Sequence, residues 1–120
     1  MATNTSRYTT TAALGTQTAQ ITELGATYVT VGGVVSVYEV YIDNTDNTVP
    51  VYVKFYNDAA PTVGTTAPDL CVFAAAAKET SWAFCPGIPF ATAVTAACLM
   101  TPGTPGVDSP TNPVTVTVTI

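Results

Sequence analysis

Pairs of carboxylates are the first side chains in this sequence that could do chemistry. A glycosidase needs two carboxylates about 5–9.5 Å apart in a cleft, one to donate a proton and one to attack the sugar or activate water. Among the eight acidic residues, Glu39 with Glu79, or Asp58 with Asp69, could form such a pair. Nothing in their spacing distinguishes them from ordinary surface carboxylates. The sequence therefore gives little support to a hydrolase.

The chain contains no histidine, which excludes Ser-His-Asp and Cys-His nucleophile systems and every metal site that uses histidine. Oxygen ligands for calcium could come from the segment Asp43-Asn-Thr-Asp-Asn-Thr48. That segment departs from the EF-hand pattern, because Thr48 stands where the sharp turn needs glycine and no glutamate ends the loop. Its residue types hydrogen-bond their own backbone and favour turns. We therefore expect a hairpin loop here, with no metal and no cofactor.

The three cysteines, Cys71, Cys85 and Cys98, are widely spaced and form no C-x-x-C pair. Neither a redox motif nor a zinc ribbon is therefore predicted. An odd number of cysteines leaves at least one thiol free, and a free cysteine behaves as a small apolar side chain. We expect three reduced and mostly buried thiols, with a disulfide between Cys85 and Cys98 as the alternative.

Aromatic side chains could line a sugar-binding face, because sugar rings stack on flat aromatic rings. The candidates are Tyr38, Tyr41, Tyr52, Tyr56 and Trp82. Tyr52 and Tyr56 share one face of a predicted strand, where packing within a sheet or against another subunit explains them better. Lys54 lies between them and is expected to be exposed. No enzyme constellation emerges, so the sequence predicts a non-catalytic structural or binding protein.

Composition narrows the class of protein further. Only 11 of the 120 residues are charged, or 9%, whereas soluble domains average about 25%. The net charge of −5 argues against a nucleic-acid partner, which needs clustered lysine and arginine. No stretch approaches the roughly 18 consecutive apolar residues of a membrane helix, and the first residues lack the pattern of a secretory signal. We expect one domain over residues 1–120 and no membrane partner.

Alternation of apolar and polar residues predicts β-strands, which the 24 threonines and 16 valines also favour. Residues 114–120 alternate perfectly. Residues 50–56 are predicted to turn three apolar side chains inward: Val51, Val53 and Phe55. The inward face of residues 34–43 is predicted to carry Val34, Tyr38, Val40 and Ile42. The opposite face of this last strand is apolar too, which suggests a covering element or a partner.

Further strands are predicted at 8–13, 18–23, 26–31, 70–75, 80–85 and 91–100. Proline and glycine at 86, 87 and 89 are expected to end one of them at Cys85. Residues 1–14 look like an N-terminal arm, and residues 101–113 form a loop with four prolines and two glycines, long enough to be functional. The many short strands predict an all-β fold, an antiparallel β-sandwich that is jelly-roll-like with about eight strands.

Three segments resemble motifs of small β-sandwich virion proteins of tailed bacteriophages. They are Tyr52-Val-Lys-Phe-Tyr56 with the turn before it, Pro61-Thr-Val-Gly-Thr-Thr-Ala-Pro68, which is the most specific, and Gly87-Ile-Pro-Phe-Ala-Thr92. The resemblance covers residues 34–100 and extends to the threonine–valine strand at the end. The chain departs from the family in residues 105–113 and in its three cysteines. Some members look like capsid cement or decoration proteins, which sit as trimers on the outer capsid.

The resemblance implies a virion structural protein that stabilises the shell, with the major capsid protein and further copies of itself, as a homotrimer, as partners. Assembly in the host cytoplasm needs no signal peptide and keeps thiols reduced. The contact residues that we expect are Arg7, Tyr8, Tyr52, Tyr56, Pro102, Pro105, Val107 and Asp108. The alternative is a tail or fibre module that binds host-surface glycans through Trp82 and the tyrosine face. The absence of a coiled-coil attachment region from the sequence favours the cement protein.

Overall fold

The computed structural model describes residues 5–9 and 17–120, and the described side chains begin at Gln17. This part of the chain forms nine strands: β1 (Thr5–Thr9), β2 (Gln17–Leu24), β3 (Val29–Gly32), β4 (Val35–Asp43), β5 (Val51–Tyr56), β6 (Leu70–Ala74), β7 (Glu79–Phe90), β8 (Val94–Leu99) and β9 (Val114–Thr119). Of the predicted arm at residues 1–14, residues 5–9 form β1, which pairs with β2. The rest of that arm, and most of the predicted strand at 8–13, lies outside the described residues.

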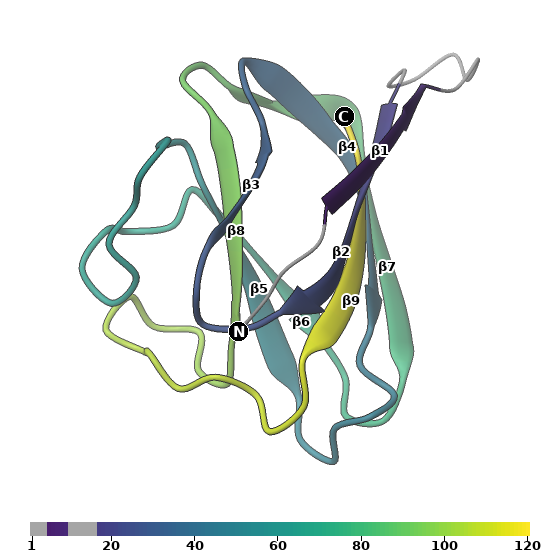
Figure 1. Cartoon of the computed structure of the whole chain (residues 1–120), viewed down its shortest axis with the longest axis vertical. Coiled ribbons are helices and arrows are strands. Elements are labelled where there is room, and N and C mark those ends of the chain that lie inside the picture. Colours follow the sequence, from purple (N-terminus) through teal and green to yellow (C-terminus); the bar gives the residue numbers. More distant parts are fainter. Residues whose placement is uncertain (1–4, 10–16) are drawn as a thin grey trace.

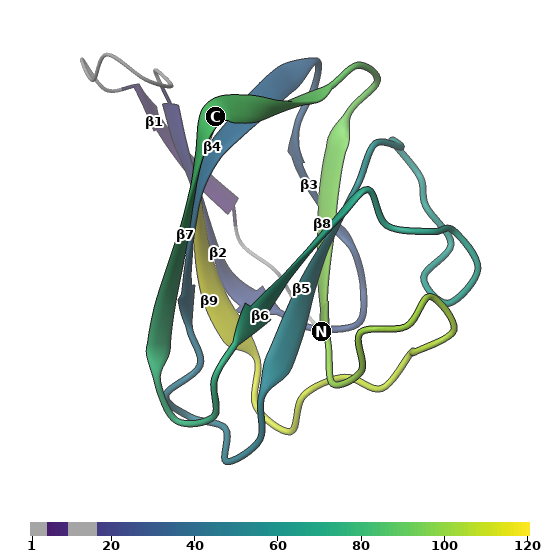
Figure 2. The same cartoon turned by 180° about the vertical axis from the view of Figure 1, so that it is seen from behind.

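The strands form two antiparallel sheets. Sheet A has the order β1-β2-β9-β4-β7, and sheet B has the order β3-β8-β5-β6. The pairs β2–β9, β3–β8, β4–β7 and β5–β6 are nested in the sequence and fall alternately in sheet A and sheet B. A long folded hairpin that is rolled up gives this arrangement, which is the jelly roll. Figures 1 and 2 show the two layers from opposite sides, and the predicted sandwich is confirmed.

The core lies between the sheets and follows the period-two pattern of the strands. In β9, Val114, Val116 and Val118 are fully buried, while the threonines between them are half-buried on the outer face. In β5, the three side chains predicted to face inward are fully buried as well. Burial of a side chain of this size contributes about 1.5–3 kcal/mol. Alternation therefore sets which face of each of these strands meets the other sheet.

Strand β4 departs from the predicted alternation. Val34 precedes the strand and is 72% exposed, whereas Val37, predicted on the outer face, is fully buried, as is Val40. The register with β7 shifts by three residues at this point, because one residue separates Val37 from Glu39 whereas four separate Ala83 from Ile88, so β7 bulges here. The bulge turns both valines inward, so β4 has no continuous apolar outer face.

Strand β7 runs through the prolines that were expected to end it. It continues past Cys85 to Phe90 and contains a cis peptide bond between Cys85 and Pro86. Because β7 is the last strand of sheet A, proline costs it no ladder hydrogen bond on the open side. Figure 2 shows its second half bending across the end of the sandwich toward β8.

The segment between β4 and β5 crosses from sheet A to sheet B, so the predicted hairpin is wrong. Its turn chemistry is as predicted, because the N–H and hydroxyl of Thr45 donate to the Asp43 carboxylate at 3.1 and 2.6 Å. A hairpin would have needed β4 and β5 to pair. Strands β4 and β5 instead lie in different sheets, and the loop connects the two sheets at one end of the sandwich.

Two buried asparagines stabilise that end. The Asn44 amide donates to the carbonyls of Val49 and Ala75, each at 3.0 Å. The Asn47 amide donates to Asn44 Oδ1 and to the Asn112 carbonyl, each at 2.9 Å. Buried amides need such partners, since an unpaired one costs about 1–3 kcal/mol. The two side chains thereby join the β4–β5, β6–β7 and β8–β9 connections.

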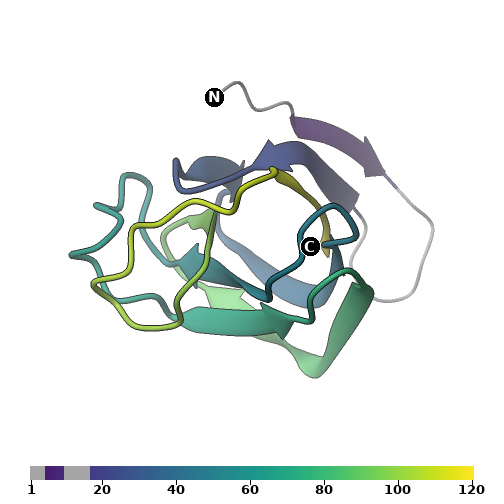
Figure 3. The ribbon, with the colours of Figure 1, turned by 90° about the horizontal axis from the view of Figure 1, so that it is seen from below.

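Two long loops cover the outer face of sheet B. Residues 57–69 connect β5 to β6, and residues 101–113 lie between β8 and β9; Figure 3 shows these loops side by side. Beneath them, the outward side chains of Lys54 and Tyr56 on β5 are buried, and so is every residue of β8. We call this region the covered face and the outer surface of sheet A the open face.

Candidate interaction surfaces

The 101–113 loop is tied to the sandwich, so its exposed residues are held in place. Lys54 Nζ donates to the Gly103 carbonyl at 2.6 Å. Further hydrogen bonds join the loop to the β2–β3 connection and to the β4–β5 connection. Four residues predicted as contacts are exposed on this loop: Pro102, Pro105, Val107 and Asp108. The structure therefore brings half of the predicted contact residues together on one ordered loop.

Val107 links the two loops of the covered face. It is 55% exposed, and its Cγ1 lies 2.5 Å from where a Cβ on Gly64 would be. Gly64 has a φ of +95°, which an L side chain rarely adopts. Glycine is therefore needed at this position for two reasons, the backbone conformation and the close approach of Val107.

Lys54 is fully buried, so the expectation that it is exposed is wrong. Desolvation lowers the pKa of its ammonium below the usual value, and the charge of the neighbouring Cys71 opposes this effect. Cys71 stands directly opposite Lys54 in the β5–β6 pair. The methylene stem of Lys54 fills the space under the 101–113 loop, and its ammonium binds the backbone of that loop.

The tyrosine face of β5 is only partly available as a contact surface. Tyr56 is 1% exposed and lies beneath the loops, so its prediction as a contact residue is wrong. Tyr52 is half-buried and its ring centroid lies 5.6 Å from that of Phe73, with the planes tilted by 58°. Phe73 is 42% exposed, and no sequence motif marked it beyond its place in a predicted strand.

The two predicted contacts in the N-terminal segment lie in β1. Arg7 is opposite Ala19 and Tyr8 is opposite Thr18 in the β1–β2 pair. Their side chains lie outside the described residues. On the backbone alone, these two residues occupy an edge of sheet A, far in strand order from β7.

The five aromatic candidates do not form one sugar-binding face. Tyr41 is on the open face, whereas Tyr56 lies beneath the loops of the covered face. The ring of Tyr38 packs over Gly87, 2.7 Å from where its Cβ would be. Trp82 donates its indole N–H to the Phe73 carbonyl at 2.7 Å and so joins the edges of the two sheets. The rings are spread over both sheets.

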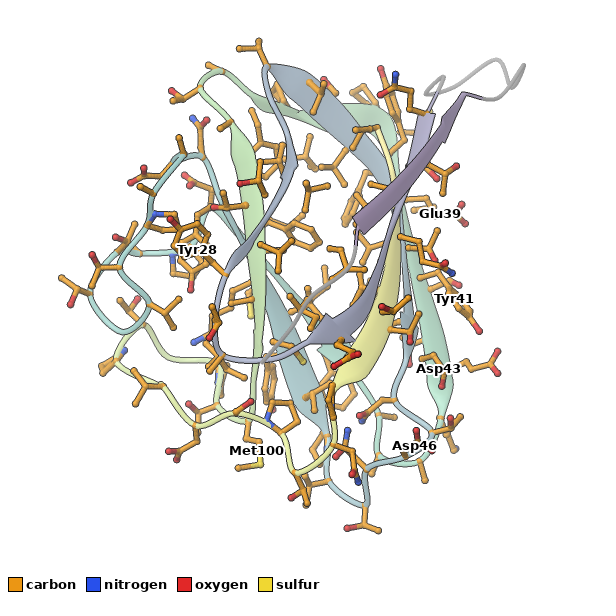
Figure 4. The ribbon with its side chains drawn as sticks, viewed as in Figure 1. Tyr28, Glu39, Tyr41, Asp43, Asp46 and Met100 are labelled. Atoms are coloured by element: carbon orange, nitrogen blue, oxygen red, sulfur yellow. The ribbon has the colours of Figure 1, made fainter. Side chains whose placement is uncertain are left out.

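The open face carries a row of carboxylates. Glu39, Tyr41 and Asp43 lie along the outside of β4 in Figure 4, and Glu79 of β7 stands opposite Asp43. A hydrogen bond to Glu79, together with desolvation and the charges of Glu79 and Asp43, raises the pKa of Tyr41 to about 12. Glu39 is opposite Ala83, four residues from Glu79, which is roughly 13 Å along the strand. That distance is too long for the glycosidase pair considered from the sequence.

The other carboxylate pair binds loop backbone. Asp69 accepts the N–H of Asn57 at 2.7 Å, and Asp58 accepts the N–H of Ala60 at 2.9 Å. Within residues 17–120, no group of three or more cysteine, aspartate or glutamate side chains is arranged to hold a metal ion. The same part of the chain contains no helix long and apolar enough to cross a membrane.

All three cysteines are free thiols, and their burial differs from the prediction. Only Cys98 is buried, while Cys71 and Cys85 are exposed. Cys98 faces the core between the sheets, and desolvation raises the pKa of its thiol to about 12. The edge positions of β6 and β7 explain the exposure of the other two.

No protein-family model, curated protein or solved structure matches this chain.

Proposed function

We propose that the protein is a non-enzymatic structural protein of a virion, a cement or decoration protein that binds the outer capsid between capsomers. The 101–113 loop is the observation that carries this proposal. It exposes Pro102, Pro105, Val107 and Asp108 while hydrogen bonds hold it against three other segments. A contact surface that is already ordered loses little conformational entropy on binding.

Two further observations support the proposal. The jelly roll is a fold that many viral capsid domains share, although fold alone does not define function. The motifs at 52–56, 61–68 and 87–92 resemble those of small β-sandwich virion proteins of tailed bacteriophages, some of which look like cement proteins. In the proposed mechanism a homotrimer bridges neighbouring capsomers. Its contacts exist only in the assembled lattice, so binding stabilises the shell by mass action.

Sedimentation with phage heads stripped of this protein tests the proposal. We expect the recombinant protein to sediment alone as a compact trimer and to pellet with stripped heads at saturable stoichiometry. Val107→Ser should weaken head binding about tenfold, as loss of a central apolar contact does. Val34→Ser removes an equally apolar, more exposed valine from the β3–β4 connection and should change binding less than about twofold.

Absence of head binding by the wild-type protein would overturn the proposal. An equal effect of the two valine substitutions would remove the loop from the contact. Saturable binding to host polysaccharide without head binding would instead support the tail or fibre module.

A further inference from the structure

Strand β7 is an unusual edge. The other three edge strands of the described sandwich, β1, β3 and β6, have five, four and five residues, whereas β7 has twelve. Folded proteins protect sheet edges by keeping them short or by placing charges and prolines on them. The two prolines of β7 lie in its second half. Between Glu79 and the first proline, the stretch from Thr80 to Cys85 has no proline and no charged residue, and its residues up to Ala83 pair with β4 in continuous register.

This unprotected stretch is accessible to a partner. Ser81, Trp82, Ala83 and Cys85 are all exposed. Trp82 stands opposite the buried Val40, so its ring points toward sheet B, where it binds the Phe73 carbonyl. The ring therefore closes the gap between the sheets and leaves the backbone edge of β7 open. Unpaired N–H and C=O groups on such an edge bind an extended segment as an added strand.

The side chains beside this edge define the charge of the segment that fits. Ser81 and Ala83 stand opposite Tyr41 and Glu39 and share the open face with Asp43 and Glu79. A strand added to β7 would thus lie beside Glu79, with Glu39 and Asp43 of β4 on the same face but one strand farther away, roughly 10 Å across the sheet.

The positive residues of the chain do not balance this row. Lys54 is buried on sheet B and Arg7 lies in β1 at the opposite end of sheet A. Lys78 lies at one end of the row, next to Glu79, and its single charge leaves the three carboxylates with a negative excess. A second copy of the chain would bring the same acidic row and the same net charge of −5. Charge complementarity favours a basic partner over a second copy.

We propose that the edge of β7 at Thr80–Cys85 docks an extended, basic segment of a partner protein, whose lysine or arginine side chains lie against the carboxylates of the open face. Under the proposed function the partner is the capsid protein, and only this identity rests on that function. Alternate residues of the docked segment point to the open face, so a lysine at every second position provides the complementary pattern.

A pair of synthetic peptides tests the proposal independently of any capsid. One blocked peptide alternates threonine with lysine and is long enough to cover Thr80–Cys85; the other has glutamate in place of each lysine. Each is titrated into the isotope-labelled full chain, and backbone amide shifts are recorded. We expect the lysine peptide to shift the amides of β7 in a saturable way and the glutamate peptide to leave them unchanged. Added salt should weaken the binding, because the charges are exposed.

Two substitutions at one exposed position serve as matched variants. Ser81→Lys should lower the affinity for the lysine peptide about three- to tenfold, because it sets like charges opposite each other. Ser81→Glu should leave the affinity for this peptide unchanged or raise it. An unchanged amide spectrum outside β7 verifies the fold of both variants.

Equal binding of both peptides, or no shift in β7 with either, would overturn the proposal. Concentration-dependent dimerisation of the wild type that both Ser81 variants abolish would overturn it too and assign the edge to a second copy. If the wild-type protein binds the lysine peptide but does not bind stripped heads, the proposed function is wrong and the docking site on β7 is supported.

Discussion

On the open face, the outward side chains of β9 are three threonines that are only partly buried. On the covered face, the outward residues Thr95 and Ala97 of β8 are fully buried. Each of the two strands has a neighbouring strand on both sides, and in each the alternate, inward side chains are apolar and face the core. The difference comes from residues 57–69 and 101–113, which lie over one sheet only. The environment of an outward side chain is thus decided by loops that are distant from it in the sequence.

Substitution of Lys54 should give the largest contrast between the faces. Lys54→Ala removes the buried stem and leaves the Gly103 carbonyl without its donor, so we expect the free energy of unfolding to fall by about 2–4 kcal/mol. Lys54→Met keeps the stem volume without the charge and should cost less than about 1.5 kcal/mol. Denaturant unfolding measures both. A loss below about 0.5 kcal/mol for Lys54→Ala would show that the loops do not seal this face.

Gly64→Ala should have the next largest effect. The new Cβ would collide with Val107 at a φ of +95°, and we expect a loss of about 1–3 kcal/mol in unfolding free energy. Gly33→Ala is the matched control, because nothing lies within 4 Å of the added Cβ. Thermal unfolding should separate the two variants, and equal melting temperatures would contradict the loop contact.

The burial of Lys54 on the covered face should also make the stability of the protein depend on pH in the alkaline range. The pKa of Lys54 is lowered in the folded state by burial, so the folded protein binds fewer protons than the unfolded chain between that lowered pKa and 10.5. Stability from this group must then rise as the pH increases toward 10.5. Denaturant unfolding of the wild type and of Lys54→Met at a series of pH values measures this dependence. The free energy of unfolding of the wild type should increase with pH relative to that of the variant. A difference between the two proteins that does not change with pH would contradict a buried ammonium.

Thr117→Ala should have the smallest effect. Thr117 is half-buried on the open face between β4 and β2, and we expect a change within about 0.5 kcal/mol. Denaturant unfolding alongside the Lys54 variants provides the comparison. A loss as large as that of Lys54→Ala would mean that the open face is covered in solution, for example by another subunit.

Most of the fold could be predicted from the sequence, because each strand records its inward face in its own alternation. The valines of β9 and the apolar triplet of β5 are buried as expected. Val37 was placed on the wrong face, since a bulge depends on pairing with β7 and leaves no local sign in β4. The extent of β7 was missed for a related reason, because prolines end a strand only where a neighbour needs their N–H groups.

The candidate site was less predictable from the sequence. The loop residues Pro102 to Asp108 were identified by composition alone, and they are exposed. Tyr56 and Lys54 were assigned to a wet face because charged and polar residues alternate with valines there. Their burial depends on contacts with loops that follow much later in the chain, such as Lys54 with Gly103. Phe73 and Trp82 gained their positions from the meeting of two sheet edges, which no single strand encodes.

The place of β9 in sheet A also determines when the protein can fold. It is the last strand in the sequence, yet it lies between β2 and β4 in the middle of the sheet. During synthesis, β2 and β4 have no common neighbour until the ribosome has released β9. Sheet A must then close through contacts between distant parts of the chain, and folds rich in such contacts are slow to form. Until β9 arrives, the nascent chain exposes two strand edges that a chaperone, or another nascent copy, can reach.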